Sequence, residues 1–177
     1  MLQYGSRKVQ RATIQLVWLK RDLRLSDHCP ILEACQTGST VVLYVFEPKL
    51  WAMPEMDRSH FDFIVESLQD MSSSLCKIGG RLCIRVGELP EVLIDIAKAA
   101  HIAGLYSHEE TGNGFTYDRD RQVVKWARHM GIPWKQFSQN GVVRPLKNRN
   151  GWAEHWQKRM NTPIAPTPTH TGTSSER

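Results

Sequence analysis

The chain has 177 residues, of which 41% are hydrophobic and 23% charged, and this length and composition can bury one ordinary globular core. No apolar run approaches the roughly 20 residues of a membrane span, and the N-terminus lacks the apolar stretch of a secretory signal. We therefore expect a soluble, cytoplasmic protein with no membrane partner. The net charge of +5 permits a polyanionic partner but is too small an excess to indicate one.

Segments typical of strands and helices alternate along the N-terminal part of the chain. Thr13–Trp18 is rich in β-branched and aromatic residues, as strands are. Thr40–Phe46 is a continuous apolar run, which is typical of a strand buried on both faces of a parallel sheet. Between them, residues 30–36 are compatible with a short helix that ends before Gly38.

A long amphipathic helix is predicted from Arg58 to the Gly79-Gly80 pair. Its apolar residues recur every three or four positions and so share one face: Phe61, Ile64, Leu68, Met71 and Leu75. Because an apolar helix face must be buried against another element, we expect this helix to cover the sheet.

The remaining chain repeats the alternation. Further strands are predicted at residues 81–86, 104–107 and 132–137. The last of them contains Pro133, which only an edge strand tolerates. Apolar stripes between these strands predict two more helices, with inward positions Leu89, Leu93, Ile96, Ala100, Val123, Ala127 and Met130. Trp152 and Trp156 lie four residues apart and indicate a short final helix.

This order of elements predicts a doubly wound α/β fold, in which helices cover both faces of a mostly parallel, Rossmann-like sheet of five strands. We expect residues 1–12 to form an N-terminal arm and residues 13–162 to form the domain. Residues 163–177 are rich in Pro, Thr and Ser, a composition that cannot pack a core. They are predicted to be a truncated flexible linker.

Ligands of open parallel sheets bind beyond the carboxyl ends of the strands, where neighbouring loops meet. The segments that follow predicted strands are residues 19–27, 47–57, 87–89 and 108–116. The first of them concentrates charge directly after the first strand, with Lys20, Arg21, Asp22, Arg24 and Asp27. Such density indicates either an internal ion-pair network or a site for an anionic ligand, and the residues alone leave both open.

The same segment carries a family resemblance. Trp18–Leu32, with the sequence WLKRDLRLSDHCPIL, closely resembles the opening signature of the DNA photolyase/cryptochrome family. In that signature an aromatic strand end precedes Arg-x-Asp-Leu-Arg or a near variant, followed by Asp-Asn or Asp-His. His28 stands where Asn is commoner. Further similar segments extend the resemblance over roughly residues 13–162: Val45–Pro48, Trp51, the helix after Arg58, Tyr106–Glu110 and Val142–Lys147.

The resemblance implies the N-terminal α/β domain of a flavoprotein, of the kind that can hold an antenna chromophore. Such a chromophore is a folate, a deazaflavin or a flavin that passes excitation to FAD, so the task of this domain would be binding and orientation. FAD would lie in a C-terminal helical domain beyond this chain. The family's chromophore loops map onto Arg21, Asp22, Phe46, Pro48, Trp51, Glu109 and Glu110 as wall residues. We expect no catalytic and no metal-binding residue here.

On this resemblance the parent protein is expected to be a light-driven deoxyribodipyrimidine photolyase, a carbon–carbon lyase of DNA repair. It would be a monomer that meets damaged DNA through the full-length protein, with the helical FAD domain in cis. The alternative parent is a cryptochrome-type blue-light photoreceptor without repair activity. A stand-alone nucleotide- or flavin-binding module is the third hypothesis. It would need a glycine-rich phosphate loop, and Gly112-Asn113-Gly114 lacks the third glycine of such a loop.

Two further groups of residues favour simple interpretations. Tryptophans at helical and edge-strand positions usually pack against a core, so Trp126 and Trp134 are expected to be packing residues. A basic cluster near the C-terminus is compatible with DNA phosphates, with the helical domain or, most simply, with a solvated surface: Arg144, Lys147, Arg149, Lys158 and Arg159.

Overall fold

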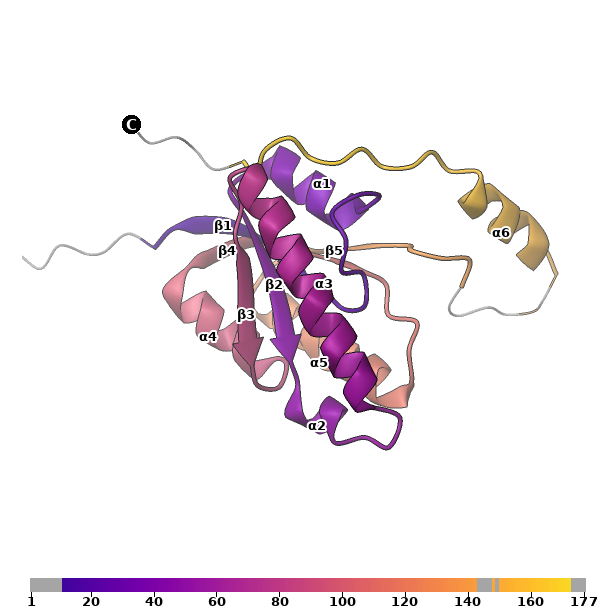
Figure 1. The fold of residues 1–177 in the computed structure, drawn as a ribbon, viewed down its shortest axis with the longest axis horizontal. Helices are drawn as coiled ribbons and strands as arrows, with labels where there is room; N and C mark the ends of the chain where they lie inside the picture. The colour runs from indigo at the N-terminus through magenta and orange to yellow at the C-terminus, as the bar shows by residue number, and fades with distance from the viewer. Residues whose placement is uncertain (1–10, 143–147, 149, 173–177) are drawn as a thin grey trace, which may run out of the picture.

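The computed structural model describes residues 11–142, 148 and 150–172. They form a five-stranded, all-parallel sheet in the order β3-β2-β1-β4-β5 (Figure 1). This arrangement confirms the predicted fold class. The strands are β1 (Thr13–Trp18), β2 (Thr40–Phe46), β3 (Leu82–Val86), β4 (His101–His108) and β5 (Trp134–Phe137). The chain starts in the middle of the sheet, builds outward to β3 and then returns to the other side of β1. The strand order therefore reverses between β1 and β4.

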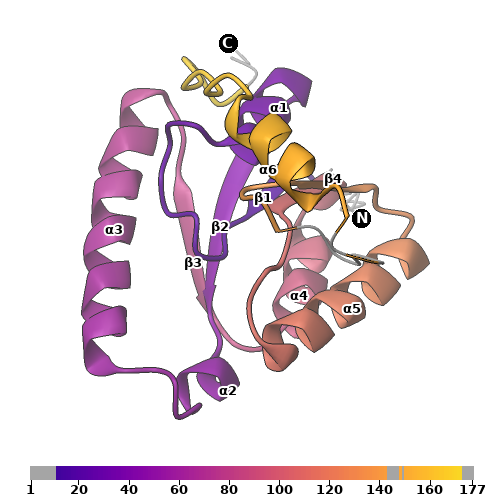
Figure 2. The ribbon, with the colours of Figure 1, turned by 90° about the vertical axis from the view of Figure 1, so that its right-hand side faces the viewer.

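Helices cover the sheet on both sides, as Figure 2 shows with α3 on one side and α4 and α5 on the other. The helices are α1 (Cys29–Thr37), α2 (Pro48–Trp51), α3 (Arg58–Lys77), α4 (Glu91–Ala99), α5 (Gly114–His129) and α6 (Trp152–Met160). One core lies between the sheet and α1 and α3, and a second between the sheet and α4 and α5. The single turn of α2 falls in a segment expected to be a loop.

The central strand β1 packs against helices on both faces of the sheet. Leu16 and Trp18 pack into the core beneath α4 and α5, whereas Val17, between them, packs into the core beneath α1 and α3. All three are almost completely buried. Successive side chains of a strand point to opposite faces, so a strand covered on both sides is mostly apolar. Gln15 is a buried polar exception in β1, with 8% exposure.

One predicted inward position is wrong and another is only partly buried. Leu68, Met71 and Leu75 of α3 are buried as expected. Phe61 packs against the ring of Phe46 at a centroid distance of 5.5 Å, but it remains 40% exposed. Met130 is 49% exposed, because α5 ends at His129 and the following residue no longer continues the helical stripe. The predicted packing tryptophans behave as expected: Trp126 lies in the core, and Trp134 stacks beside Trp18 with ring centroids 5.9 Å apart.

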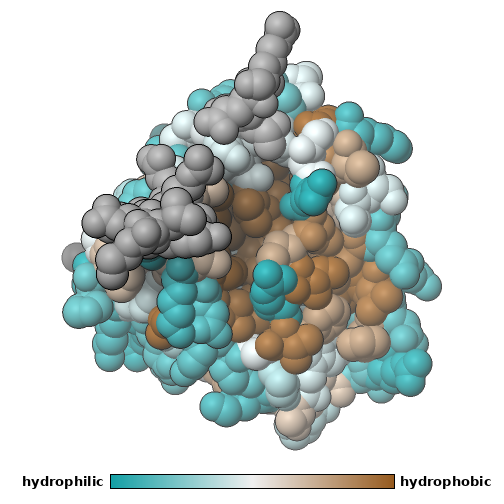
Figure 3. All heavy atoms as spheres, turned by 90° about the vertical axis from the view of Figure 1, so that its left-hand side faces the viewer, coloured by the Kyte–Doolittle hydropathy of each residue, from teal (hydrophilic) through white to brown (hydrophobic). Residues whose placement is uncertain are grey.

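The edge strand β3 carries exposed apolar side chains. Ile84 and Val86 are 44% and 73% exposed, and Figure 3 shows a broad group of apolar side chains on the face that carries this edge. Edge strands leave one row of backbone groups without a strand partner. Among the described helices, none is long and apolar enough to cross a membrane.

The described part of the predicted linker is held against the domain. The backbone N–H of Ala165 donates to the Asp27 carboxylate at 3.1 Å, and the N–H of Asp27 donates to the Ala165 carbonyl at 3.2 Å. The N–H of Thr40 donates to the carbonyl of Thr171, which is 1% exposed. Backbone hydrogen bonds thus join residues 163–172 to the domain. The division into arm, domain and linker stays a prediction.

Candidate functional site

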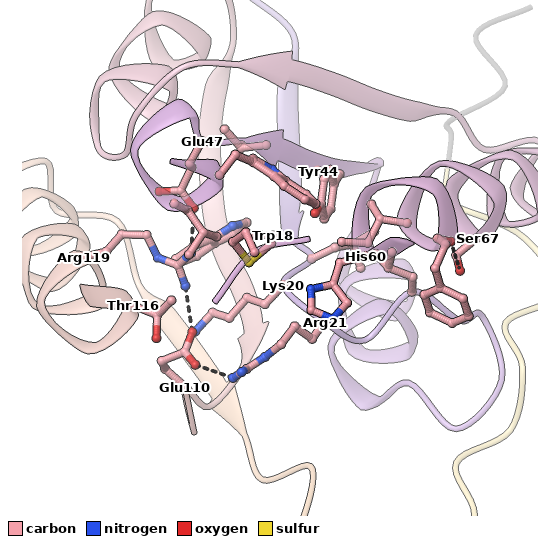
Figure 4. Close-up of a pocket in the computed structure, with 18 of the residues that line it drawn as sticks. Trp18, Lys20, Arg21, Tyr44, Glu47, His60, Ser67, Glu110, Thr116 and Arg119 are labelled. Carbon is pink, nitrogen blue, oxygen red and sulfur yellow. Dashed lines mark hydrogen bonds and ion pairs between the residues drawn. The ribbon is translucent and has the colours of Figure 1, made fainter. Parts of the chain in front are cut away.

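The carboxyl ends of β1, β2 and β4 open into a cavity of about 750 Å³. Its walls come from the loop between β1 and α1, from α2 and α3, and from the N-terminal half of α5 (Figure 4). The β1–α1 loop lies at the tips of the neighbouring strands: Leu19 donates its N–H to Leu43 of β2, and the Asp22 side chain meets His108 at the end of β4. The charged loop therefore lies where the sequence predicts a binding crevice.

The floor of the charged end is the indole ring of Trp18. The Lys20 ammonium lies 4.6 Å and the Arg119 guanidinium carbon 4.7 Å from the ring centre, which is within cation–π range. Lys20 forms a short ion pair with Asp120 of α5. Arg119 donates to Glu47 at 2.6 Å. Both cations are thus fixed over an aromatic face and paired with carboxylates.

Glu110 connects Arg119 of α5 to Arg21 of the β1–α1 loop at this charged end. Its carboxylate accepts hydrogen bonds from Arg119 at 2.7 Å, from Arg21 at 2.6 Å and from the backbone of Gly112 at 2.6 Å. Figure 4 shows Arg21 reaching across to Glu110 beneath Lys20. Of the two interpretations left open for the loop, the structure shows an ion-pair network. Its partners lie on α5 and on the loop after β4, more than 80 residues along the chain.

The network shifts the proton affinities of its members. Burial lowers the pKa of Lys20, although Asp120 opposes the shift. Burial raises the pKa of Glu47 and of Asp120, and their cationic partners offset only part of that rise. For Arg119, burial acts to lower the pKa, but the surrounding carboxylates outweigh it and the pKa is raised. The network is therefore held by mutual neutralisation and presents little net charge to the cavity.

Asp22 lies behind the cavity wall at the centre of a buried cluster. Its carboxylate accepts from His108 Nδ1 at 2.5 Å and from the backbone of Lys20 at 2.7 Å, and His28 Nε2 lies 2.9 Å away. Burial alone would raise the pKa of Asp22, but the bonds from His108 and His28 outweigh it and hold the pKa below its usual range. Each of the three side chains is at most 2% exposed. The cluster therefore fixes the charged loop to β4.

A metal ion does not explain this cluster, although its ligand atoms lie within 4.8 Å of one another. Donors about 2.0–2.2 Å from a tetrahedral zinc ion lie more than about 3 Å apart, whereas His108 and Asp22 are in direct hydrogen-bond contact. His28 also has a structural task, because its Nδ1 accepts the N–H of Ile31 and caps α1. The family signature more often has Asn at the position of His28, and Asn is a preferred capping residue. His28 caps the helix as well, so the replacement keeps the cap.

The other end of the cavity is mainly apolar. It is lined by Leu50, Trp51, Met56, Phe63 and Ile64, with the polar residues Glu55, His60 and Ser67 on the same segments. The Trp51 ring is held from behind by Phe46 and Phe61, with ring centroids 6.1 and 5.4 Å away. Phe63 is 67% exposed at the cavity wall. This end offers aromatic and aliphatic surface to a ligand, where the charged end offers hydrogen-bonding groups.

Three of the predicted wall residues line this cavity, namely Arg21, Trp51 and Glu110. The other four lie outside its lining. Asp22 is buried in the histidine cluster, Phe46 packs behind Trp51, and Pro48 begins α2. Glu109 lines a separate hollow of about 230 Å³ beside α5. The structure thus gathers part of the predicted set, and the role of each residue toward a ligand stays a prediction.

Several lining residues escaped the sequence analysis. Asn113 caps α5, and a polar stripe runs along that helix through Thr116 and Arg119, which both line the cavity, before it becomes the apolar stripe of Val123 and Ala127. The polar stripe continues the predicted apolar stripe, and this periodicity is the sequence signal that could have identified the lining residues of α5. Within the predicted basic cluster, Arg159 donates to the Gln139 carbonyl, and Arg144, Lys147 and Arg149 lie outside the described residues.

The chain is similar in sequence to known proteins. Residues 15–158 match the model of the DNA photolyase family. Cryptochrome DASH of Synechocystis sp. is 29% identical over 136 residues, which are 73% of this chain and 28% of that protein. The chain thus spans little more than a quarter of the length of this relative.

Solved structures show the same fold. The Synechocystis sp. PCC6803 cryptochrome matches with a TM-score of 0.77 and 23% identity, over 94% of this chain and 38% of that chain. An archaeal photolyase from Sulfolobus tokodaii, solved with two FAD molecules, matches with a TM-score of 0.69 and 21% identity, over 90% and 38% of the two chains. The present chain therefore belongs to the DNA photolyase family, and its fold is that of the N-terminal α/β domain of photolyases and cryptochromes.

Proposed function

We propose that the cavity at the strand ends binds an antenna chromophore, namely a folate, a deazaflavin or a flavin. The observation that carries the proposal is the position and make-up of the cavity. It lies beside the point where the strand order reverses, which is the usual ligand position in doubly wound sheets. Its volume of about 750 Å³ is within the range of small-molecule sites.

The two ends of the cavity fit a planar heterocycle. Such a molecule has apolar ring faces and polar ring edges. Trp51 and Phe63 supply surface for the faces, and the charged end supplies hydrogen-bonding groups for the edges. The two FAD molecules of the archaeal photolyase imply a novel light-harvesting cofactor in that protein, which is consistent with a second chromophore here. Bound in this cavity, a chromophore would absorb light and pass excitation on, while the chain's own residues hold and orient it.

Binding can be tested directly with the purified chain. We expect one of three probes, 5,10-methenyltetrahydrofolate, 8-hydroxy-5-deazaflavin or FMN, to show a shifted or quenched emission on titration. Failure of all three to bind would contradict the proposal. The site is tested with a pair of serines on α3, both of which donate to the carbonyl four residues earlier. Ser67 lines the cavity and Ser73 is exposed elsewhere. Ser67→Trp should fill the cavity and abolish binding, whereas Ser73→Trp should bind as the wild type does.

For the parent protein we propose a light-driven DNA photolyase, in which a helical domain in cis carries FAD and meets damaged DNA. A cryptochrome-type photoreceptor is the second candidate, and it is favoured by the relatives named cryptochrome. The residues that would distinguish them surround the flavin and the lesion. The test is repair of cyclobutane pyrimidine dimers in DNA by the full-length protein under blue light. Repair supports the photolyase, and light-dependent FAD reduction without repair supports the photoreceptor.

A further inference from the structure

Tyr44, near the end of β2, is a largely buried residue with a hydroxyl group beside the cavity. The residue is 6% exposed and belongs to the core beneath α1 and α3, yet it also lines the cavity. Its ring packs edge-on against Phe46, with centroids 5.0 Å apart and planes at 77°. The side chain is therefore held in one position, and Figure 4 shows it among the lining residues on the side that carries Glu47.

Most neighbouring polar groups of the cavity have protein partners, although Glu47 Oε2 and Arg119 Nε lack one among the described residues. Arg119 and Glu110 bond to each other and to further groups, and the Thr116 hydroxyl donates to the Asn113 carbonyl. Like those two atoms of Glu47 and Arg119, the Tyr44 hydroxyl has no hydrogen-bond partner among the residues that the structure describes, and it belongs to a side chain that lines the cavity. A polar group that a ligand covers is unfavourable unless the ligand forms a hydrogen bond with it. A ligand in the cavity would supply the missing partner.

The hydroxyl can act as a donor at any physiological pH. Burial, reinforced by the nearby Glu47, raises the pKa of Tyr44 to about 12. The phenol is therefore neutral and keeps its proton. It can therefore donate a hydrogen bond to an acceptor atom of a ligand, a ring carbonyl oxygen included.

We propose that Tyr44 donates a hydrogen bond to a carbonyl oxygen on the ring system of the bound chromophore and so sets its depth and orientation in the cavity. This inference rests on the proposed antenna function and names a residue that positions the ligand. Folates, deazaflavins and flavins all carry such a ring carbonyl. With its carbonyl on Tyr44, the ring extends toward Ile64 and Phe63 of α3, which supply apolar contact.

The test removes the hydroxyl and keeps the ring. Tyr44→Phe in the complete chain should weaken binding of whichever of the three probes the wild type binds by about tenfold, the effect of roughly one hydrogen bond. It should also shift the absorption band of the bound chromophore, because its carbonyl loses a donor. The melting temperature without chromophore should be unchanged or higher, since only an unpaired hydroxyl is lost.

Tyr106→Phe is the matched control. Tyr106 is 3% exposed and lies in the same core, but it does not line the cavity. The control should bind with wild-type affinity and show the wild-type absorption band. If Tyr44→Phe keeps both the affinity and the spectrum, the inference is wrong while the proposed function stands. If the wild type binds none of the probes, the proposed function fails and the inference fails with it.

Discussion

The two ends of the cavity are built in opposite ways. At the charged end, cations and carboxylates from four separate segments bond to one another and are nearly all buried. At the apolar end, Trp51 and Phe63 offer ring surface, and Phe63 remains largely exposed. The end that the sequence marks as rich in charge is mainly committed to holding the fold. The end without a charged motif keeps more of its surface free for a ligand.

The largest effect is expected from breaking the charged end at Arg119. Arg119→Met removes the cation that joins Glu47 and Glu110 and leaves both carboxylates buried without it. Removing one partner of a buried ion pair typically lowers the free energy of unfolding by about 3–5 kcal/mol. Urea denaturation monitored by circular dichroism measures this change.

Arg121 provides the control for that experiment. It pairs with Asp118 on the exposed side of the same helix, where ion pairs contribute about 1 kcal/mol or less. Arg121→Met should therefore unfold within about 0.5 kcal/mol of the wild type. Equal losses in the two variants would show that the buried network does not hold this end of the cavity.

A smaller effect is expected from Asp22→Asn, which weakens the bonds to His28 and His108 and should lower the free energy of unfolding by about 1–3 kcal/mol at neutral pH. The pKa of Asp22 is lowered in the folded state from an ordinary value of 3.8. Its contribution is therefore present above pH 3.8 and is lost as the pH falls below that value.

The pH dependence separates this charge from the shape of the side chain. In denaturant titrations below about pH 4, the wild type should lose stability more steeply than Asp22→Asn. Parallel curves for the two proteins would mean that the Asp22 charge contributes nothing beyond packing.

The smallest effect on stability is expected at the apolar end. Phe63 is 67% exposed, so Phe63→Ala should change the free energy of unfolding by no more than about 0.5 kcal/mol. Chromophore affinity should nevertheless fall several-fold, because ring contact with the ligand is lost. Val86→Ala, at an exposed position of β3, is the control and should leave both quantities unchanged. An unchanged affinity in Phe63→Ala would remove this residue from the site.

Much of the fold could be predicted from the sequence because its signals are local. The apolar runs of β1 and β2 and the stripe through Leu68, Met71 and Leu75 report burial directly. The end of such a stripe is less certain. Periodicity cannot show that Phe61 of α3 remains partly exposed, since that depends on what packs against it in space.

The site was harder to predict because its contacts join distant parts of the chain. The β1–α1 loop and Glu110 were expected at one crevice, but Arg119 lies in the middle of a charged helix with no local sign of its partners. Tyr44 could not be predicted as a site residue for a different reason. It belongs to an apolar strand in which every residue is consistent with the core, and only the three-dimensional position shows which hydroxyl meets the cavity.

A crystal structure of the chain loaded with its chromophore tests the central claim most directly. The account predicts that the ring system lies between the tips of β1 and β2 and helix α3, with a carbonyl oxygen at hydrogen-bond distance from the Tyr44 hydroxyl. A chromophore bound elsewhere, for example against the β3 edge or α6, with this cavity empty, would contradict it.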